Sequence, residues 1–226
     1  MAKFSAMALA LFLASIAGAT ENGSTQCVRF VYLVSADREV KAEYLHAVER
    51  AARGVRDWYA GQLDGATFHL HNPVVEVLRS DKKAAWFTSN PNGRHRDNWG
   101  FNNTLSELKL LRGALPGQDG FAWVLYSDGP GNKGRAVRGY AYLPEDDLLG
   151  LVGKHPTQPN PKRWEGGLGH ELGHALGLPH PADTKKHARA IMWAGFYGHY
   201  PKGAYLTGQD KRILRANPLI VAPAER

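Results

Sequence analysis

The first half of the chain alternates between fully apolar segments and segments in which apolar residues recur every three or four positions. Continuous apolar runs cover residues 28–34 and 121–126, which is typical of strands covered on both faces. Residues 38–60 carry apolar side chains at helical spacing, with Glu, Lys and Arg between them. This pattern predicts an amphipathic helix that ends at Gly61. Strand-like segments follow at 67–70 and 74–78, and Pro73 between them indicates a bend or a sheet edge.

Several helix signals lie in the remaining sequence. The stretch from Thr104 to Glu107 has the pattern of a capping box, which predicts a short helix that begins there and runs to Gly113. Residues 162–176 carry an apolar stripe at helical spacing, and a last helix is expected from Thr207 until Asn217-Pro218 stops it. The segments 81–100 and 144–161 are rich in loop-forming residues and are predicted to be loops.

The segment 137–143 predicts an outer strand. Small or apolar residues alternate there with Arg138, Tyr140 and Tyr142, so we expect one buried and one exposed face. Strands that alternate with helices, without internal repeats, predict an α/β fold around one sheet.

The N-terminus differs in character from the rest. A lysine precedes an apolar run at residues 4–16, and small residues at 17–19 match the pattern that signal peptidase cleaves. We therefore expect a signal peptide at residues 1–19, a secreted protein, and one domain at 20–226. The alternative, a membrane helix, is disfavoured because the run is short for a hydrocarbon core of about 30 Å.

Cys27 is the one cysteine, which excludes a disulfide within the chain. It is either a ligand that keeps a metal site latent or an unpaired cysteine at the start of a strand.

Charge adds a weaker constraint. The chain carries 28 Lys and Arg against 21 Asp and Glu, a formal charge of +7. These positive residues are scattered and accompany no nucleic-acid-reading motif, so we expect no nucleic-acid partner. A basic surface can still favour acidic partners through long-range attraction.

The segment GHELGHALGLPH, residues 169–180, carries the candidate chemistry. His170 and His174 are one helical turn apart and share a face, so their imidazoles can converge on one metal ion. Glu171 is placed to reach a water on that metal, as a general base requires. Gly177 can end the helix in a left-handed conformation and turn the chain, which allows His180 to become the third ligand. Three protein ligands leave a fourth position for water, which is typical of a catalytic zinc site.

These five positions match HExxHxxGxxH, and the sequence resembles the metzincin clan of zinc endopeptidases. The resemblance implies a zincin fold with a mixed twisted sheet, an antiparallel edge strand that pairs with the substrate, an active-site helix and a C-terminal helix. It also implies a methionine turn beneath the metal, for which Met192 is the candidate. The edge strand would be the segment 137–143.

Within the clan, residues 128–131 and 139–144 are similar to matrixins, but the structural-zinc residues and the cysteine-switch propeptide of that family are missing. A calcium ion at Asp128 is possible but unsupported, because an ordinary turn aspartate is the better explanation of this residue. His69 and His71 share a strand face and could also bind metal, but no third partner is nearby in the sequence.

The sequence thus predicts a secreted zinc-dependent endopeptidase that acts on a protein or peptide substrate. Two alternatives stay open: a secreted zinc-binding protein without proteolytic activity, and a zinc amidase that acts on non-protein amides.

Overall fold

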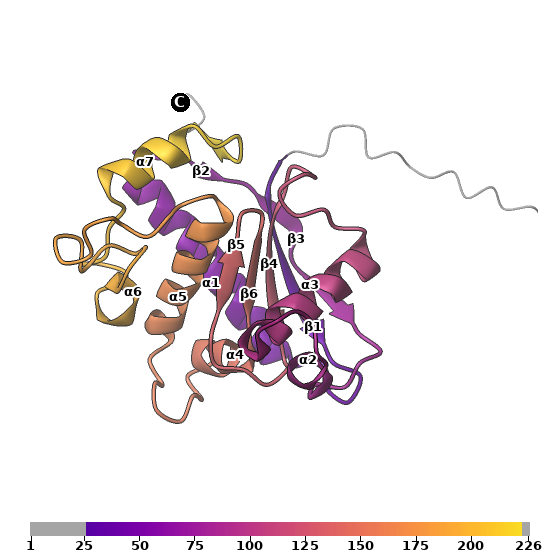
Figure 1. Ribbon diagram of the computed structural model, residues 1–226. Helices are drawn as coiled ribbons and strands as arrows, with labels where there is room; N and C mark the ends of the chain where they lie inside the picture. The colour runs from indigo at the N-terminus through magenta and orange to yellow at the C-terminus, as the bar shows by residue number, and fades with distance from the viewer. Residues whose placement is uncertain (1–25, 223–226) are drawn as a thin grey trace, which may run out of the picture.

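A computed structural model describes residues 26–222 of the chain, in which a five-stranded sheet lies between two layers of helices (Figure 1). The strand order is β3-β1-β4-β6-β5. Four strands are parallel, and β5 at the edge runs antiparallel to β6. The strand bounds are β1 Val28–Val34, β3 Leu70–Arg79, β4 Ala122–Ser127, β5 Arg135–Val137 and β6 Tyr140–Leu143. A small antiparallel pair joins β2 (Thr67–Phe68) to β7 (Ile220–Val221). The predicted α/β fold with a mixed sheet and an antiparallel edge strand is confirmed.

The helices bury both faces of the sheet. On one face lie α1 (Ala42–Gln62), α4 (Glu145–Leu151) and α5 (Pro161–Ala175), and on the other α2 (Trp86–Ser89) and α3 (Trp99–Arg112). The remaining helices are η1 (Arg96–Asn98), α6 (Gly195–Gly198) and α7 (Gly208–Arg215). Alternate side chains of β1 point to opposite faces, so Phe30 packs with α1 and α5 while Val31 packs with α2 and α3. This double burial explains the continuous apolar runs of β1 and β4.

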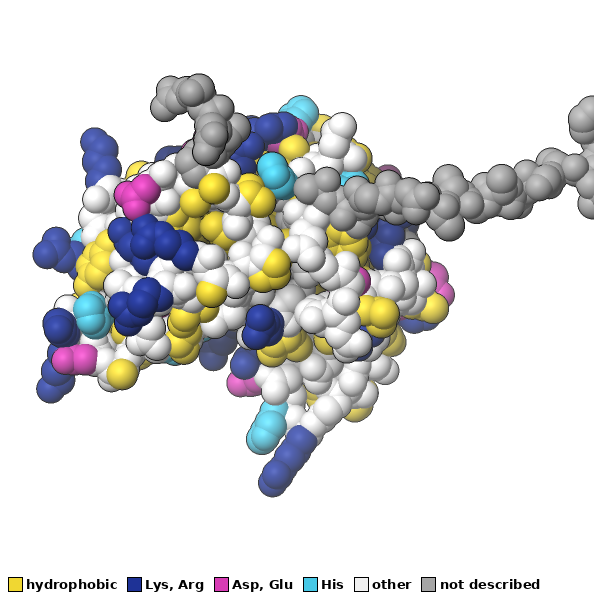
Figure 2. All heavy atoms as spheres, turned by 90° about the horizontal axis from the view of Figure 1, so that it is seen from above, with side chains coloured by type: hydrophobic (Ala, Val, Ile, Leu, Met, Phe, Trp, Pro, Cys, Tyr) yellow, Lys and Arg dark blue, Asp and Glu magenta, His cyan; other side chains and the backbone are white. Residues whose placement is uncertain are grey.

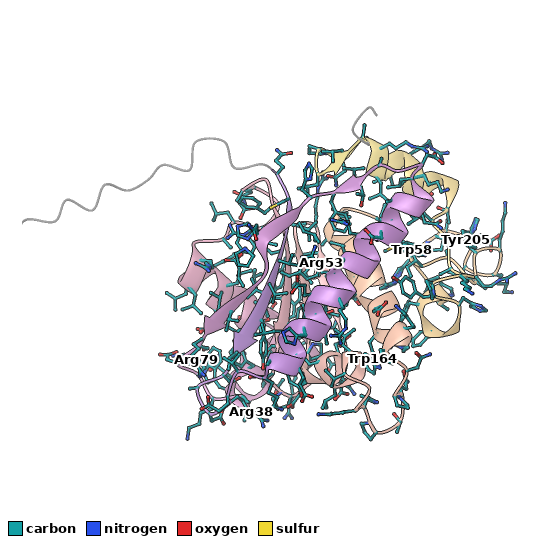
Figure 3. The ribbon with its side chains drawn as sticks, turned by 180° about the vertical axis from the view of Figure 1, so that it is seen from behind. Arg38, Arg53, Trp58, Arg79, Trp164 and Tyr205 are labelled. Atoms are coloured by element: carbon teal, nitrogen blue, oxygen red, sulfur yellow. The ribbon has the colours of Figure 1, made fainter. Side chains whose placement is uncertain are left out.

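Helix α1 extends beyond its predicted C-terminus. It continues through Gly61 to Gln62, and the chain turns at Asp64 and Gly65, both of which have a positive φ. Glycine inside a helix costs only about 1 kcal/mol, which packing against the sheet outweighs. Seen from behind, α1 crosses in front of α5, and Trp58 donates a hydrogen bond to the Pro201 carbonyl at 3.0 Å (Figure 3).

The predicted capping box at Thr104 is wrong. Helix α3 begins at Trp99, so Thr104 lies inside it and donates a hydrogen bond to the Gly100 carbonyl at 2.7 Å. Glu107 is buried and accepts a hydrogen bond from Ser80 instead of capping the helix. The predicted end is confirmed, since Gly113 terminates α3 in a left-handed conformation with φ of 61°.

The single outer strand expected at 137–143 is also wrong. Residues 135–143 form a hairpin in which Gly139, with φ of 84°, separates β5 from β6. Strand β6 is internal and buried on both faces, because α3 covers the side of Tyr140 and Tyr142 that we expected to face solvent. The antiparallel edge strand is therefore β5. The predicted loop at 144–161 likewise contains α4, whose first turn holds three acidic residues after Pro144.

Two further sequence predictions, for β3 and for α7, are confirmed. Strand β3, which contains Pro73, is an edge strand as expected. Thr207 is the N-cap residue of helix α7 and forms a reciprocal capping box with Asp210. The predicted signal peptide at residues 1–19 lies outside the described residues. Within residues 26–222, no helix combines the length and the apolar character that a membrane span requires. Figure 2 shows Lys and Arg side chains spread over the half of the upper face that carries α7.

Candidate metal centre and active site

Three histidines converge at the C-terminal end of α5. His170 and His174 lie on the helix and His180 follows it, and together they form the one group of three or more potential metal ligands found within residues 26–222. The Nε2 atom of His174 lies 3.2 Å from Nε2 of His170 and 3.1 Å from Nε2 of His180. The structure thus brings together the three side chains that the sequence predicted to bind one metal ion.

The end of α5 turns the chain back through a Schellman motif. The amide of Leu178 donates to the Gly173 carbonyl at 2.9 Å, and the amide of Gly177 donates to the His174 carbonyl at 2.9 Å. Gly177 has φ of 94°, the left-handed conformation that the sequence predicted for it. The same turn places the Leu178 carbonyl 2.8 Å from Nδ1 of His174. One local structure therefore ends the helix, brings His180 back and orients His174.

A second backbone carbonyl orients His170. Its Nδ1 lies 2.8 Å from the carbonyl of Ile191, the residue before Met192. Nδ1 carries the proton in such a pair, so the Nε2 lone pair is directed toward the other two histidines. Met192, the candidate for the methionine turn, is fully buried, and its sulfur lies close to Gly173 of α5.

Glycines of α5 permit the close approach of this turn. A β-carbon at Gly173 would collide with the sulfur of Met192, and one at Gly166 would lie 3.0 Å from the Cβ atoms of Phe196 and Tyr200. Gly166 and Gly173 of α5 are therefore required by packing against Met192 and the segment that follows it. The metal motif alone does not require Gly166.

The donor set fits zinc. Zn–N bonds of about 2.0–2.1 Å in a tetrahedral site place neighbouring nitrogens about 3.4 Å apart, close to the two separations observed. Burial lowers the pKa of His170 to about 3, with the neighbouring His174 and His180 adding to the effect. Burial also lowers the pKa of His174. Both imidazoles are thus neutral near pH 7, which is the form that binds a metal ion.

Glu171 lies beside the cluster and lines a cavity of about 250 Å³. Burial raises its pKa to about 8, Asp147 adds to this increase, and Arg135 and Arg163 oppose it. A β-carbon on Gly134 would lie 3.0 Å from Cγ and 3.1 Å from Oε1 of Glu171. The loop before β5 therefore limits where the carboxylate can move.

Sequence reasoning missed four residues of this environment: Gly134, Arg135, Asp147 and Arg163. None belongs to the histidine motif, and they come from the loop before β5, from β5, from α4 and from α5. The proximity of Gly134, Arg135 and Asp147 to Glu171 depends on the hairpin and on α4, neither of which was predicted, whereas Arg163 lies on the same helix as Glu171.

Aromatic rings surround the histidines on the side opposite the sheet. Phe196 packs on His170 with ring centroids 4.7 Å apart, and Trp193 packs on His180 with centroids 5.6 Å apart. Trp193 is 41% exposed, so this wall of the site faces the solvent.

Three other candidate residues lie outside the cluster. Asp128 is buried and accepts hydrogen bonds from the backbone and the side chain of Ser35, so it joins the ends of β1 and β4. His71 contacts Glu76 at 3.7 Å, and neither it nor His69 belongs to a ligand cluster in the described chain. Cys27 is buried directly before β1, and burial raises the pKa of its thiol. It does not belong to the group of potential metal ligands that His170, His174 and His180 form.

No protein family matches the sequence, and no curated protein matches it either. Solved structures do match. Wild-type OgpA from Akkermansia muciniphila aligns with a TM-score of 0.63 and 19% identity over 90% of this chain and 64% of that chain. Catalytically inactive OgpA in complex with an O-glycopeptide (glycodrosocin) substrate aligns with a TM-score of 0.64 and 17% identity over the same shares. Archaemetzincin from Methanopyrus kandleri aligns with a TM-score of 0.43 and 18% identity over 84% of this chain and 94% of that chain.

The chain thus spans about two thirds of the length of OgpA. At these identities the likeness concerns the fold. The chain therefore shares the fold of OgpA over the aligned residues.

Proposed function

We propose that this protein is a zinc-dependent endopeptidase of the metzincin type, exported after removal of residues 1–19 and built as one catalytic domain. The observation that carries the proposal is the convergence of three histidine nitrogens next to the partly buried side chain of Glu171. A purely structural zinc site is closed by four protein ligands, whereas this cluster supplies three.

The substrate would bind as an added strand. Strand β5 is the last strand of the sheet, and the described residues leave its outer edge without a partner. An extended peptide could form backbone hydrogen bonds with this edge. Helix α5 lies against the hairpin that contains β5 (Figure 1), so a peptide bound there would pass close to Glu171.

The catalytic roles follow from the positions of the side chains. When bound, zinc would lower the pKa of a water toward about 7 and polarise the scissile carbonyl. Glu171 would accept a proton from the attacking water and return it to the leaving amine. His170 and His174 are held by the carbonyls of Ile191 and Leu178, which keeps their Nε2 atoms directed at the metal.

The first experiment separates metal binding from catalysis. Glu171→Gln should retain zinc but lose about 10²- to 10⁴-fold in turnover, because the general base is removed while the ligands remain. His174→Ala should lose both zinc and activity. Zinc content is measured by elemental analysis, and activity is measured with a mixed peptide library. Glu49→Gln, on the outer face of α1, is the control and should behave as the wild type.

The outcomes also test the alternatives. Cleavage of peptides that a chelator abolishes supports the endopeptidase. Zinc binding without cleavage of any peptide or non-protein amide would indicate a binding protein, and cleavage confined to non-protein amides would indicate an amidase. Purified mature protein that binds no zinc would refute the proposal. N-terminal sequencing of protein recovered from the medium tests the export step.

A further inference from the structure

The cavity beside Glu171 has an unusual concentration of positive charge. It is bordered by the loop before β5, by β5 itself and by α4, α5 and α6. Three cationic side chains line it: Lys133, Arg135 and Arg163. None of them forms a salt bridge with a carboxylate in the part of the chain that the structure describes. Positive charges on the surface elsewhere are often paired, as Arg53 is with Glu49 on α1.

Arg163 is held in place by contacts that do not include a salt bridge with an acidic side chain. Its Nε donates to Oε1 of Gln158 at 3.1 Å. Its guanidinium lies 4.6 Å from the ring centroid of Trp164 and 4.5 Å from that of Tyr197. Aromatic faces hold a guanidinium well but leave its in-plane N–H groups free to donate. A fixed arginine with free donors can bind a carboxylate through two parallel hydrogen bonds.

Two acidic groups also line the cavity. Glu171 is committed to the proposed reaction. Asp147 is 5% exposed, and its carboxyl accepts no hydrogen bond from a side chain or backbone group of the described residues. Burial raises the pKa of Asp147 to about 7, against the opposing effect of Arg163. Burial favours the protonated form of this carboxyl, which carries no charge and can itself donate a hydrogen bond.

We propose that this cavity is a subsite for an acidic side chain of the substrate, Asp or Glu, next to the scissile bond. The inference rests on the proposed peptidase function, because the cavity shares Glu171 with that site. Its volume of about 250 Å³ lies just below the range of pockets that enclose drug-sized ligands, so it suits one side chain. The three cations would supply the charge-assisted hydrogen bonds that a desolvated carboxylate requires. A glycosylated side chain, which could use the aromatic walls, is the competing occupant.

Binding to a protein that does not cleave is the direct test. Zinc-loaded Glu171→Gln is titrated with fluorescent peptides in which a single Asp or Glu is scanned along an otherwise neutral sequence. Each peptide is compared with its Asn or Gln counterpart and with one that carries a glycosylated Ser. At one position the acidic peptide should bind about tenfold or more tightly than its amide counterpart. Added salt should reduce this preference.

Variants assign the preference to the cavity. Lys133→Gln with Arg135→Gln, placed in the Glu171→Gln protein, should lower the acid-to-amide ratio, and adding Arg163→Gln should bring that ratio close to one. Arg135→Lys should retain a large part of the preference, because it keeps the charge. Arg53→Gln, which removes a positive charge from the outer face of α1, should leave the ratio unchanged. Circular dichroism confirms that each variant is folded.

Four results would overturn the inference: equal binding of acidic and amide peptides at every position, tighter binding of the glycosylated peptide, an undiminished preference in the variant that lacks all three cations, or equal weakening of all peptides in that variant. Failure of the proposed function looks different. In that case zinc-loaded protein with Glu171 intact cleaves no peptide, whereas the binding preference of the Glu171→Gln protein is measured independently of cleavage.

Discussion

Gly134 allows the loop before β5 to approach Glu171 closely, because glycine has no side chain. It belongs to the loop before β5, and its α-carbon lies so close to Glu171 that an added methyl group would come within 3.0 Å of the glutamate Cγ. Glycine is thus required here by the close approach of the loop to the carboxylate, since its φ is not in the left-handed region.

Gly134→Ala should reduce kcat about 10- to 100-fold while zinc content is retained, because displacement of a catalytic group by as little as about 1 Å can cost this much. Steady-state kinetics and elemental analysis provide the measurement. The matched control is Gly61→Ala, where an added β-carbon meets no atom within 4 Å. A Gly134→Ala protein with unchanged kcat would show that Glu171 is free to move.

The histidine motif was predictable because its geometry is local. His170, His174 and Gly177 are related by the helical repeat and by one helix-ending conformation, both of which are visible in the sequence. Gly134 and Asp147 were not predictable, because only tertiary structure brings a loop and a short helix against Glu171. At the scale of single residues, the sequence identifies those members of a site that are related by spacing within one helix or strand. It does not identify the members that tertiary structure brings to the site from other elements.

At the scale of elements, the C-terminal end of α5 couples helix termination to the arrangement of the three histidines. The Schellman motif that ends the helix also supplies the Leu178 carbonyl to His174 and returns the chain to His180. The wrong prediction for β6 has a related cause, because it too depends on tertiary structure. The tyrosines of β6 are amphipathic and were expected to face solvent, but α3 covers them and Thr104 lies 2.9 Å from the Tyr140 hydroxyl.

Gly177→Ala should destabilise the protein by about 1–2 kcal/mol, the cost of a left-handed conformation for a residue with a β-carbon. It should also weaken zinc binding, because His180 depends on that turn. Gly113→Ala is the matched control: it places the same strain at the end of α3, away from the histidines. Chemical denaturation and competition with a zinc chelator measure the two effects. Equal zinc affinity in the two variants would separate helix termination from metal binding.

At the scale of the whole molecule, the buried Asp147 makes stability depend on pH. Its pKa is raised from 3.8 to about 7 in the folded protein, chiefly by burial. The folded state therefore binds a proton more tightly than the unfolded state does. This contribution to stability is fully present below about pH 4 and is lost as the pH rises through about 7.

Asp147→Asn should remove this dependence. The free energy of unfolding of the wild type, relative to the variant, should fall by on the order of 2–4 kcal/mol between pH 4 and 7.5. Urea unfolding at a series of pH values measures both proteins, and the difference between them cancels the titration of the histidines. Parallel pH profiles for the two proteins would mean that Asp147 is solvated.

The open edge of the sheet also bears on how copies of this protein behave toward one another. An unpaired strand is a template for edge-to-edge association between identical molecules. Here the exposed strand is only three residues long, and Lys133, Arg135 and Arg138 lie along or beside it. Two such edges would repel each other, and so short a strand offers few backbone groups to join. The edge that would receive an extended peptide is thereby protected against self-association and aggregation in concentrated solution.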